Sequence, residues 1–331
     1  MPLPSRRRFI GITAAAAGLG LMPFGRAARA EARLVTWHGQ AMGAVATLQV
    51  HHHDRAAAER LVERSLAEVR RLEGVLSLYR DDSALSTLNR QGFLVAPPAA
   101  LVELLAECRR CWELTGGAFD PTVQALWVLY RDHFSRPGAD PAGPSGPALR
   151  EALERVGFGD VAFDANRIVL PRRGMGLTLN GIAQGYMTDR VVDVLRTGGI
   201  ASSLVDMGEP RAMGSRPSGE PWRVGIADPD DPERISETLE AVDQAVATSG
   251  AYGFRFDPAG RFNHLLDPRT GASPHLHRSV TVVLPTATAA DALSTAFSLL
   301  PPEEIRHTLQ RLGEGQVHLV PASGKASLLR A

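Results

Sequence analysis

The hydrophobic residues of this chain alternate with a period of two in some stretches and of three to four in others. Residues 35–51 follow the pattern of strands and pass through Met42-Gly43. The next stretch, residues 54–72, places its apolar side chains on one helical face: Leu61, Val62, Leu66 and Val69. We therefore expect strand material followed by an amphipathic helix at the start of the folded part.

The same patterns predict the remaining elements. Helices are predicted over residues 98–115, 148–156, 186–197 and 289–300, and strands over 161–170, 176–179, 279–284 and 316–320. Several short strands are predicted between residues 200 and 255, and residues 135–147 form a Pro/Gly-rich loop. Strands and helices mix without a regular strand–helix–strand period, which favours an α+β fold over a doubly wound sheet.

The first thirty residues carry the pattern of an export signal. Residues 5–9 read SRRRF, a twin-arginine sequence, residues 10–24 are apolar, and residues 28–30 read ARA, a small-x-small cleavage site. The apolar run is too short and too rich in Gly for a membrane span. We therefore expect a signal peptide over residues 1–30 and a periplasmic protein. The alternative is a chance basic N-terminus on a cytoplasmic protein.

Charge and length narrow the class of protein further. The first thirty residues hold five of the 36 basic residues and none of the 36 acidic ones, so the remainder has a net charge of about −5. This balance does not suit nucleic-acid binding. No later segment is long and apolar enough to span a membrane. About 300 residues suffice for one large domain or two intimately packed subdomains.

The chain has two cysteines, Cys108 and Cys111, three positions apart in the helix predicted over residues 98–115. Two thiols at this spacing share one helical face, which here is the apolar one. Core thiols are the favoured interpretation, and a local disulfide or a redox pair are the alternatives. Without a second cysteine pair, a structural zinc site is not expected.

Three polar segments precede residue 190. Residues 79–89 could start a helix with Asp82 or Ser83 as N-cap, or could contribute to a site. In residues 115–122, Gly116 and Gly117 allow close approach of the backbone to a ligand, or Gly116 forms a helix C-cap. Residues 179–186 join a predicted strand to a predicted helix, whose free N–H groups would suit a phosphate.

The C-terminal part combines a candidate base with a candidate metal pair. His264 lies beside an Asp-Pro-Arg-Thr-Gly turn and could act as a general base. Asp291 and Thr295 are four residues apart on one helical face, so a carboxylate and a hydroxyl could reach one Mg²⁺. Alternatively, Asp291 is only an acid in the first helical turn. His51-His52-His53 is more consistent with a solvated connection than with a metal site.

Together these segments resemble the ApbE-type FAD:protein FMN transferases. In chain order, the resemblance is carried by Met42-Gly43, Leu78-Tyr79-Arg80 with Asn89, and residues 116–122, 181–186, 247–250, 264–271 and 291–295. It implies an ApbE-like α+β domain over residues 31–331, made of two intimately packed α/β subdomains with mainly antiparallel sheets flanked by helices. It also implies an enzyme that uses FAD and Mg²⁺ to transfer FMN to a Thr or Ser hydroxyl of a client flavoprotein, releasing AMP.

By position, the resemblance assigns roles to individual residues. FAD contacts are implied for Met42, Tyr79, Ala118, Phe119, Asp120, Thr178 and Gln184. Magnesium ligands are implied for the carbonyl of Gly181 and for Asp291 and Thr295. The catalytic loop would hold His264 as the base, with Asp267 and Arg269 shaping it. Thr178 and Gln184 depart from the acid and from the Lys or Glu that the family usually carries, which weakens the expected adenosine-side or phosphate-side contacts.

A further departure is residues 206–209, which read DMGE where the family usually has Asn-x-Gly-Gly-Asp. Together with the twin-arginine pattern, this variant resembles the NosX-like branch, which accompanies nitrous oxide reductase maturation. The client would then be a membrane-bound flavoprotein of the NosR type. Two alternatives stay open, a Mg²⁺-dependent FAD pyrophosphatase and a flavin-binding maturation chaperone without catalysis.

Overall fold

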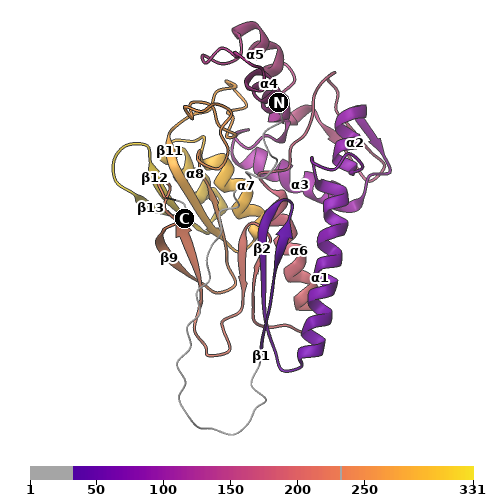
Figure 1. Ribbon diagram of the computed structural model, residues 1–331, viewed down its shortest axis with the longest axis vertical. Helices are drawn as coiled ribbons and strands as arrows, with labels where there is room; N and C mark the ends of the chain where they lie inside the picture. Colours follow the sequence, from indigo (N-terminus) through magenta and orange to yellow (C-terminus); the bar gives the residue numbers. More distant parts are fainter. Residues whose placement is uncertain (1–32, 232) are drawn as a thin grey trace.

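An eight-stranded, fully antiparallel sheet forms the centre of the molecule (Figure 1). The structure is a computed structural model and describes residues 33–231 and 233–331. In sheet order the strands are β1 (Arg33–Ala41), β2 (Ala44–His52), β6 (Ser203–Asp206), β7 (Pro210–Met213), β10 (Ala245–Ser249), β11 (His277–Leu284), β12 (Gln316–Pro321) and β13 (Ser327–Arg330). The predicted signal peptide over residues 1–30 lies outside the described residues.

Helices cover one face of this sheet. The long α1 (Arg55–Leu76) runs beside the β1–β2 hairpin, and α6 (Ala183–Thr197) and α7 (Ala287–Phe297) follow it across the sheet (Figure 1). Behind them, α3 (Ala99–Leu114) packs against α7 and α1. The main core therefore lies between the sheet and this helical layer.

A two-stranded ribbon of β8 (Trp222–Ala227) and β9 (Ile235–Ala241) covers part of the other face. Successive side chains of a strand point to opposite faces of the sheet, so the central strands contribute residues to the cores on both faces. In β11, Val280 and Val282 join the helical core, whereas Val283 joins Trp222 and Val224 beneath the ribbon. Both faces of β11 are therefore buried, and its C-terminal half is mostly apolar.

The remaining elements flank these layers. They are α2 (Ala84–Gln91), α4 (Gln124–Phe134), α5 (Gly146–Leu153), α8 (Pro302–Leu312), the short helices η1 (Pro121–Val123) and η2 (Phe158–Asp160), and a small sheet of β3 (Phe93–Val95), β5 (Arg167–Val169) and β4 (Ala162–Phe163). Within the described residues, no helix has the length and apolar character that crossing a membrane requires.

The predicted α+β class with mainly antiparallel sheets is confirmed, and most predicted elements appear within a few residues of their expected bounds. The helix start near residue 83 is also confirmed, because Ser83 Oγ accepts a hydrogen bond from Ser86 N at 2.9 Å. Helices α4 and α8 and the edge strands β3 and β13 were not predicted.

The strand predicted over residues 176–179 is wrong. These residues form no strand, and an asparagine side chain binds their backbone in place of a neighbouring strand. Asn89 accepts a hydrogen bond from Leu177 N at 2.7 Å and donates one to the Leu177 carbonyl at 2.8 Å. One amide thus satisfies both backbone groups of a residue 88 positions away, so no strand partner is needed.

Cys108 and Cys111 are free thiols on the buried face of α3. Burial raises the pKa of Cys111 to about 12 and that of Cys108 well above its ordinary value. Thiols of this kind are unreactive at neutral pH. The interpretation as core residues is confirmed.

One carboxylate fixes α7 against α6. Asp189 of α6 accepts hydrogen bonds from Ala287 N and Thr288 N, each at 2.9 Å, and thereby satisfies donors that the first turn of α7 leaves free. Its charge is balanced by Arg211 of β7, whose Nη1 lies 2.6 Å from Asp189 Oδ1. Both side chains are almost buried, so loss of either one would leave the other as a buried charge without its partner.

We therefore expect Asp189→Ala to lower the free energy of unfolding by about 3–5 kcal/mol, because it leaves a buried arginine and two backbone donors unpaired. Asp193→Ala on the same helix is the control, since Asp193 is about half exposed and its arginine partners lie 3.6 Å away; its effect should stay within about 0.5 kcal/mol. Urea denaturation measures both values, and equal effects would contradict the cross-link.

Candidate active site

A cavity of about 230 Å³ lies where α6 and α7 meet the β1–β2 turn and the loop after β10. Its walls include eight of the residues predicted for the site: Met42, Tyr79, Thr178, Gly181, Gln184, His264, Asp291 and Thr295. These residues come from segments far apart in the sequence. The fold therefore brings most of the predicted site together in one place.

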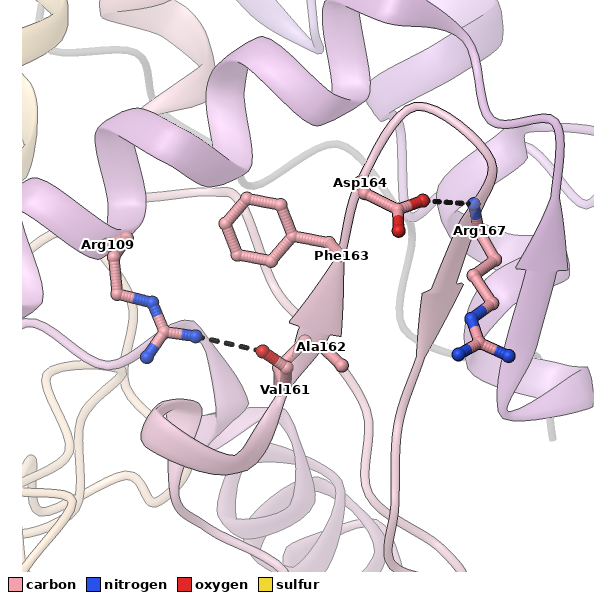
Figure 2. A pocket seen from close by; sticks show the side chains of 6 residues that line it. All are labelled: Arg109, Val161, Ala162, Phe163, Asp164 and Arg167. Atoms are coloured by element: carbon pink, nitrogen blue, oxygen red, sulfur yellow. Dashed lines mark hydrogen bonds between the residues drawn. The ribbon is translucent and has the colours of Figure 1, made fainter.

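A second hollow lies between α3 and the β4–β5 hairpin and contains none of these residues (Figure 2). One of its charged groups, Arg109, donates a hydrogen bond to the Val161 carbonyl at 2.8 Å. The same guanidinium lies 4.8 Å from the centre of the Phe158 ring. Arg109 is thus engaged in packing the small sheet onto α3, and the candidate chemistry lies in the first cavity.

Two glycines allow the polar end of the first cavity to form. A Cβ atom at Gly185 would lie 2.2 Å from the Ala287 carbonyl oxygen, and one at Gly181 would lie 2.8 Å from Thr295 Oγ1. Any side chain at either position would push α6 or the segment before it away from α7. The Gly-x-x-x-Gly spacing is therefore needed for close packing of backbone against α7.

Asp291 and Thr295 line the cavity from α7, one turn apart. Asp291 Oδ2 accepts a hydrogen bond from Gly185 N at 2.9 Å. Neither Asp291 Oδ1 nor Thr295 Oγ1 forms a hydrogen bond with any of the described residues. Two oxygen atoms are thus left to bind a ligand in the cavity.

This donor set fits a hard divalent cation such as Mg²⁺. A carboxylate oxygen, a hydroxyl oxygen and the nearby backbone of Gly181 are the kinds of ligand that Mg²⁺ takes, together with water and substrate phosphates. Residues 33–231 and 233–331 contain no cluster of three or more His, Cys, Asp and Glu side chains that could hold a metal. A cation here would therefore depend on hydroxyl, backbone and substrate oxygens besides Asp291.

Further carboxylates make this end of the cavity acidic. Glu209 lines it, and burial together with the charges of Asp291 and Asp206 raises the pKa of Glu209 well above its ordinary value. Burial likewise raises the pKa of Asp291 and of Asp206, each to about 7. Glu209 was not predicted as a site residue, although it lies in residues 206–209, which resemble a variant of the usual family sequence.

Gln184 and Thr178, two of the expected departures from the usual family residues, both line the cavity. The Gln184 side chain lies against Gly208, where a Cβ atom would be 2.6 Å from Gln184 Cδ. Gly208 also has φ +119°, a conformation that other residues rarely adopt. Thr178 is held by its backbone N–H, which donates to the Pro121 carbonyl at 2.8 Å.

His264 enters the cavity as a neutral base with a defined orientation. Its Nδ1 lies 3.2 Å from the Phe254 carbonyl, which can only accept, so Nδ1 carries the proton and Nε2 has a free lone pair. Burial lowers the pKa of His264 below 6.5 and keeps the ring neutral near pH 7. Its Nε2 can therefore accept a proton from a group in the cavity.

Ala118, Phe119 and Asp120 are not among the residues that line this cavity. Ala118 and Phe119 are core residues, and Asp120 accepts hydrogen bonds from Thr122 N at 2.8 Å and from Phe158 N at 2.9 Å. In this structure Asp120 thus connects η1 to η2, and contact between these three residues and FAD stays a prediction.

Asp267 and Arg269 also lie outside the lining. Arg269 donates from its backbone N at 2.8 Å and from its guanidinium at 3.0 Å to Asp267. Asp267 N in turn donates to the Ala272 carbonyl at 2.8 Å. The pair closes the turn that follows His264, so it can position the base without touching a ligand.

An aromatic wall of the cavity was missed by the sequence analysis. Trp127 of α4 and Phe254 after β10 both line the cavity, and their ring centres are 6.1 Å apart. Trp127 follows the glycine-containing segment over residues 115–122, but the helix that carries it was not predicted. The period of its apolar residues could have revealed α4 and this tryptophan.

Comparison with known proteins adds an independent line of support. The family model described as "ApbE family" matches residues 42–319. Among curated proteins, the "FAD:protein FMN transferase" of Treponema pallidum is 36% identical over 275 residues, covering 76% of this chain and 74% of that protein. The protein of the same name from Haemophilus influenzae is 30% identical over 308 residues, covering 88% and 86%.

Solved structures give the same result. "Flavin Transferase ApbE from Vibrio cholerae" superposes with a TM-score of 0.78 at 26% identity, covering 91% of this chain and 97% of that one. The apo form of the Pseudomonas stutzeri flavinyl transferase ApbE superposes with a TM-score of 0.76 at 30% identity, covering 91% and 95%.

The orientation of His264 leads to a direct prediction. NMR titration of its ring should give a pKa below 6.5, because burial disfavours the charged imidazolium. A His264→Gln variant identifies the resonance, since only the signal of His264 disappears from its spectrum. A pKa above 6.5 would mean that the ring is protonated more easily than in water and would contradict its assignment as a neutral base.

Proposed function

Because the chain belongs to the ApbE family, we propose that it is a Mg²⁺-dependent FAD:protein FMN transferase that modifies a Thr or Ser hydroxyl. The transferase activity itself follows from the curated relatives of that name. The observation that carries the finer proposal is the combination in one cavity of two unpaired α7 oxygens, on Asp291 and Thr295, with the free Nε2 of His264.

The chemistry needs a nucleophile, a leaving group and charge neutralisation. His264 Nε2 accepts the proton of the client hydroxyl, and the hydroxyl oxygen attacks the FMN-side phosphorus of FAD. A new phosphoester bond forms, the pyrophosphate bond breaks, and AMP leaves with the bridging oxygen. Mg²⁺ bound by Asp291, Thr295 and the Gly181 carbonyl would neutralise charge on the phosphate oxygens.

Two aspects of the proposal rest on the sequence. The twin-arginine pattern in residues 1–30 supports export, so we place the enzyme and its client in the periplasm. The DMGE variant at residues 206–209 supports a role in nitrous oxide reductase maturation, with a membrane-bound flavoprotein of the NosR type as client.

The central test is to incubate the protein with FAD, Mg²⁺ and a fragment of a NosR-type client and to measure the client's mass. The expected result is a gain of one FMN. Hydrolysis of FAD with no labelling of any client tested would favour the pyrophosphatase, and bound but unchanged FAD would favour the maturation chaperone. Labelling of a different flavoprotein would support the transferase activity and contradict only the proposed identity of the client.

Removing the acidic ligand should abolish Mg²⁺-dependent transfer. We expect Asp291→Ala and Asp291→Asn to lower the transfer rate about a thousandfold, because charge neutralisation at the phosphate is lost. The asparagine variant retains the size of the side chain, so it separates loss of charge from loss of packing. Asp193→Asn on the surface of α6 is the control. Full activity in the asparagine variant would contradict the metal assignment.

Removing the base should slow transfer without loss of FAD binding. For His264→Ala we expect a rate about 10²–10⁴-fold lower, the usual contribution of a general base. The dissociation constant of FAD should change little, since the ring acts on the client hydroxyl. An unchanged rate in this variant would remove His264 from the mechanism.

A further inference from the structure

The outer edge of β1 is the longest strand edge that the sheets leave open within the described residues. Strand β1 has nine residues and pairs with β2 along its whole length without a bulge. The opposite edge of the central sheet is β13, with four residues, and the small sheet ends in strands of three and two residues. Proteins usually protect such an edge by shortness, a bulge, Lys or Pro, and β1 has none of these.

The hydrogen-bond register shows which backbone groups of β1 point outward. His51 N donates to the Ser202 carbonyl at 3.1 Å, so the odd-numbered residues of β2 bond to β6 and the even-numbered ones to β1. Their partners in β1 are odd-numbered, because Ala41 pairs with Ala44. The N–H and C=O groups of the even-numbered residues therefore point away from the sheet, and these residues form what we call the β1 edge: Leu34, Thr36, His38 and Gln40.

The groups of the β1 edge are accessible and have no internal partner. All four residues are exposed, and none of their backbone groups forms a hydrogen bond to another residue of the described chain. On the opposite side of the strand, Val35 and Trp37 pack against the main core. Strand β1 is thus fixed in place by its core side, while its edge presents a row of unpaired donors and acceptors.

The β1 edge leads to the candidate active site. Met42 and Gly43, which form the β1–β2 turn, come two and three positions after Gln40 and line the cavity. The turn lies at the end of the hairpin that is nearer to α4 (Figure 1). Met42 N donates to Glu73 Oε1 at 2.8 Å, which ties the turn to α1. An extended chain on the β1 edge would therefore reach the cavity within a few residues, at about 3.3 Å per residue.

We propose that the β1 edge binds an extended segment of the client protein as an additional strand and brings its Thr or Ser hydroxyl to the cavity. This inference rests on the proposed function, which requires a client chain to approach His264. Strand addition recognises a partner mainly through its backbone hydrogen bonds. The β1 edge can thus accept segments that differ in the side chains around the acceptor residue.

The properties of the edge favour a client over a second copy of this chain. A stable dimer typically buries about 1,600 Å² or more, whereas a transient complex can be smaller. A client leaves after each turnover, so backbone pairing along one strand is sufficient for it. The four residues of the β1 edge include no Asp, Glu, Lys or Arg, and they therefore do not repel a bound segment of either charge.

Amide hydrogen exchange, followed by NMR, tests this binding directly. The probe is the NosR-type fragment, or the flavoprotein fragment that gains FMN in its place, added to the full-length protein without FAD. We expect exchange at Thr36, His38 and Gln40 to slow at least tenfold, with the amides of β13 as the unchanged internal control. Unchanged exchange at the β1 edge would overturn the inference. Slowing that depends on the concentration of the enzyme alone would also overturn it and would place a second copy on this edge.

A proline substitution tests whether the edge matters for transfer. His38→Pro removes one outward N–H and none of the bonds to β2, at a position where edge strands tolerate proline. His38→Ala is the matched control, because it keeps this N–H and also loses the contact between His38 Nδ1 and Thr47 Oγ1 at 3.2 Å. We expect only the proline variant to raise the KM for the client, about three- to tenfold, with kcat and the Kd of FAD unchanged. Equal KM values in the two variants would contradict the inference.

The outcomes separate this inference from the proposed function. A client that gains FMN while exchange at the β1 edge and the KM stay unchanged would overturn the inference alone. If no client fragment gains FMN, the proposed function fails, whereas slowed exchange on addition of the NosR-type fragment would still support strand addition. Binding of FAD shows whether the proline variant is folded, and the exchange experiment on the unmodified protein decides if it is not.

Discussion

The close approach of α6 and α7 is the constraint on which the rest of the site depends. At Gly185 the backbone of α6 lies so close to α7 that no side chain would fit, and the Gly185 N–H donates a hydrogen bond to Asp291 of α7. Asp189, one turn further along α6, holds the first turn of α7 and is itself neutralised by Arg211 from the sheet. Sheet, α6 and α7 are thus linked by one network, which sets the position of Asp291 and Thr295.

The cavity built on this contact separates two tasks. Its acidic end brings the Asp291 and Glu209 carboxyl groups together where a cation and phosphates would meet; burial raises the pKa of both groups, and a bound cation would favour their charged forms. Its aromatic end presents the uncharged rings of Trp127 and Phe254. These rings lie beside His264, which is neutral near pH 7 because burial lowers its pKa. An enzyme that divides a dinucleotide needs both environments within one cavity, because the substrate itself has a charged centre and apolar rings.

Local patterns predicted much of this structure. The β1–β2 hairpin, α1, α6, β11 and α7 follow directly from hydrophobic periodicity, and eight predicted site residues line the cavity. The errors arise where a long-range partner decides the outcome. Residues 176–179 are held by the Asn89 amide rather than by a strand, and Glu209 faces the cavity because of how β7 pairs within the sheet. Neither contact leaves a periodic pattern in the sequence.

The wide separation of the lining residues along the chain has a thermodynamic consequence. The cavity joins Met42 to Thr295 across several strands of the central sheet. Contacts of such high sequence separation form late in folding, after the entropy of loop closure has been overcome. A ligand in this cavity would consequently bind the native state alone, and mass action would stabilise the entire domain by about 2.7 kcal/mol at a hundred times its Kd.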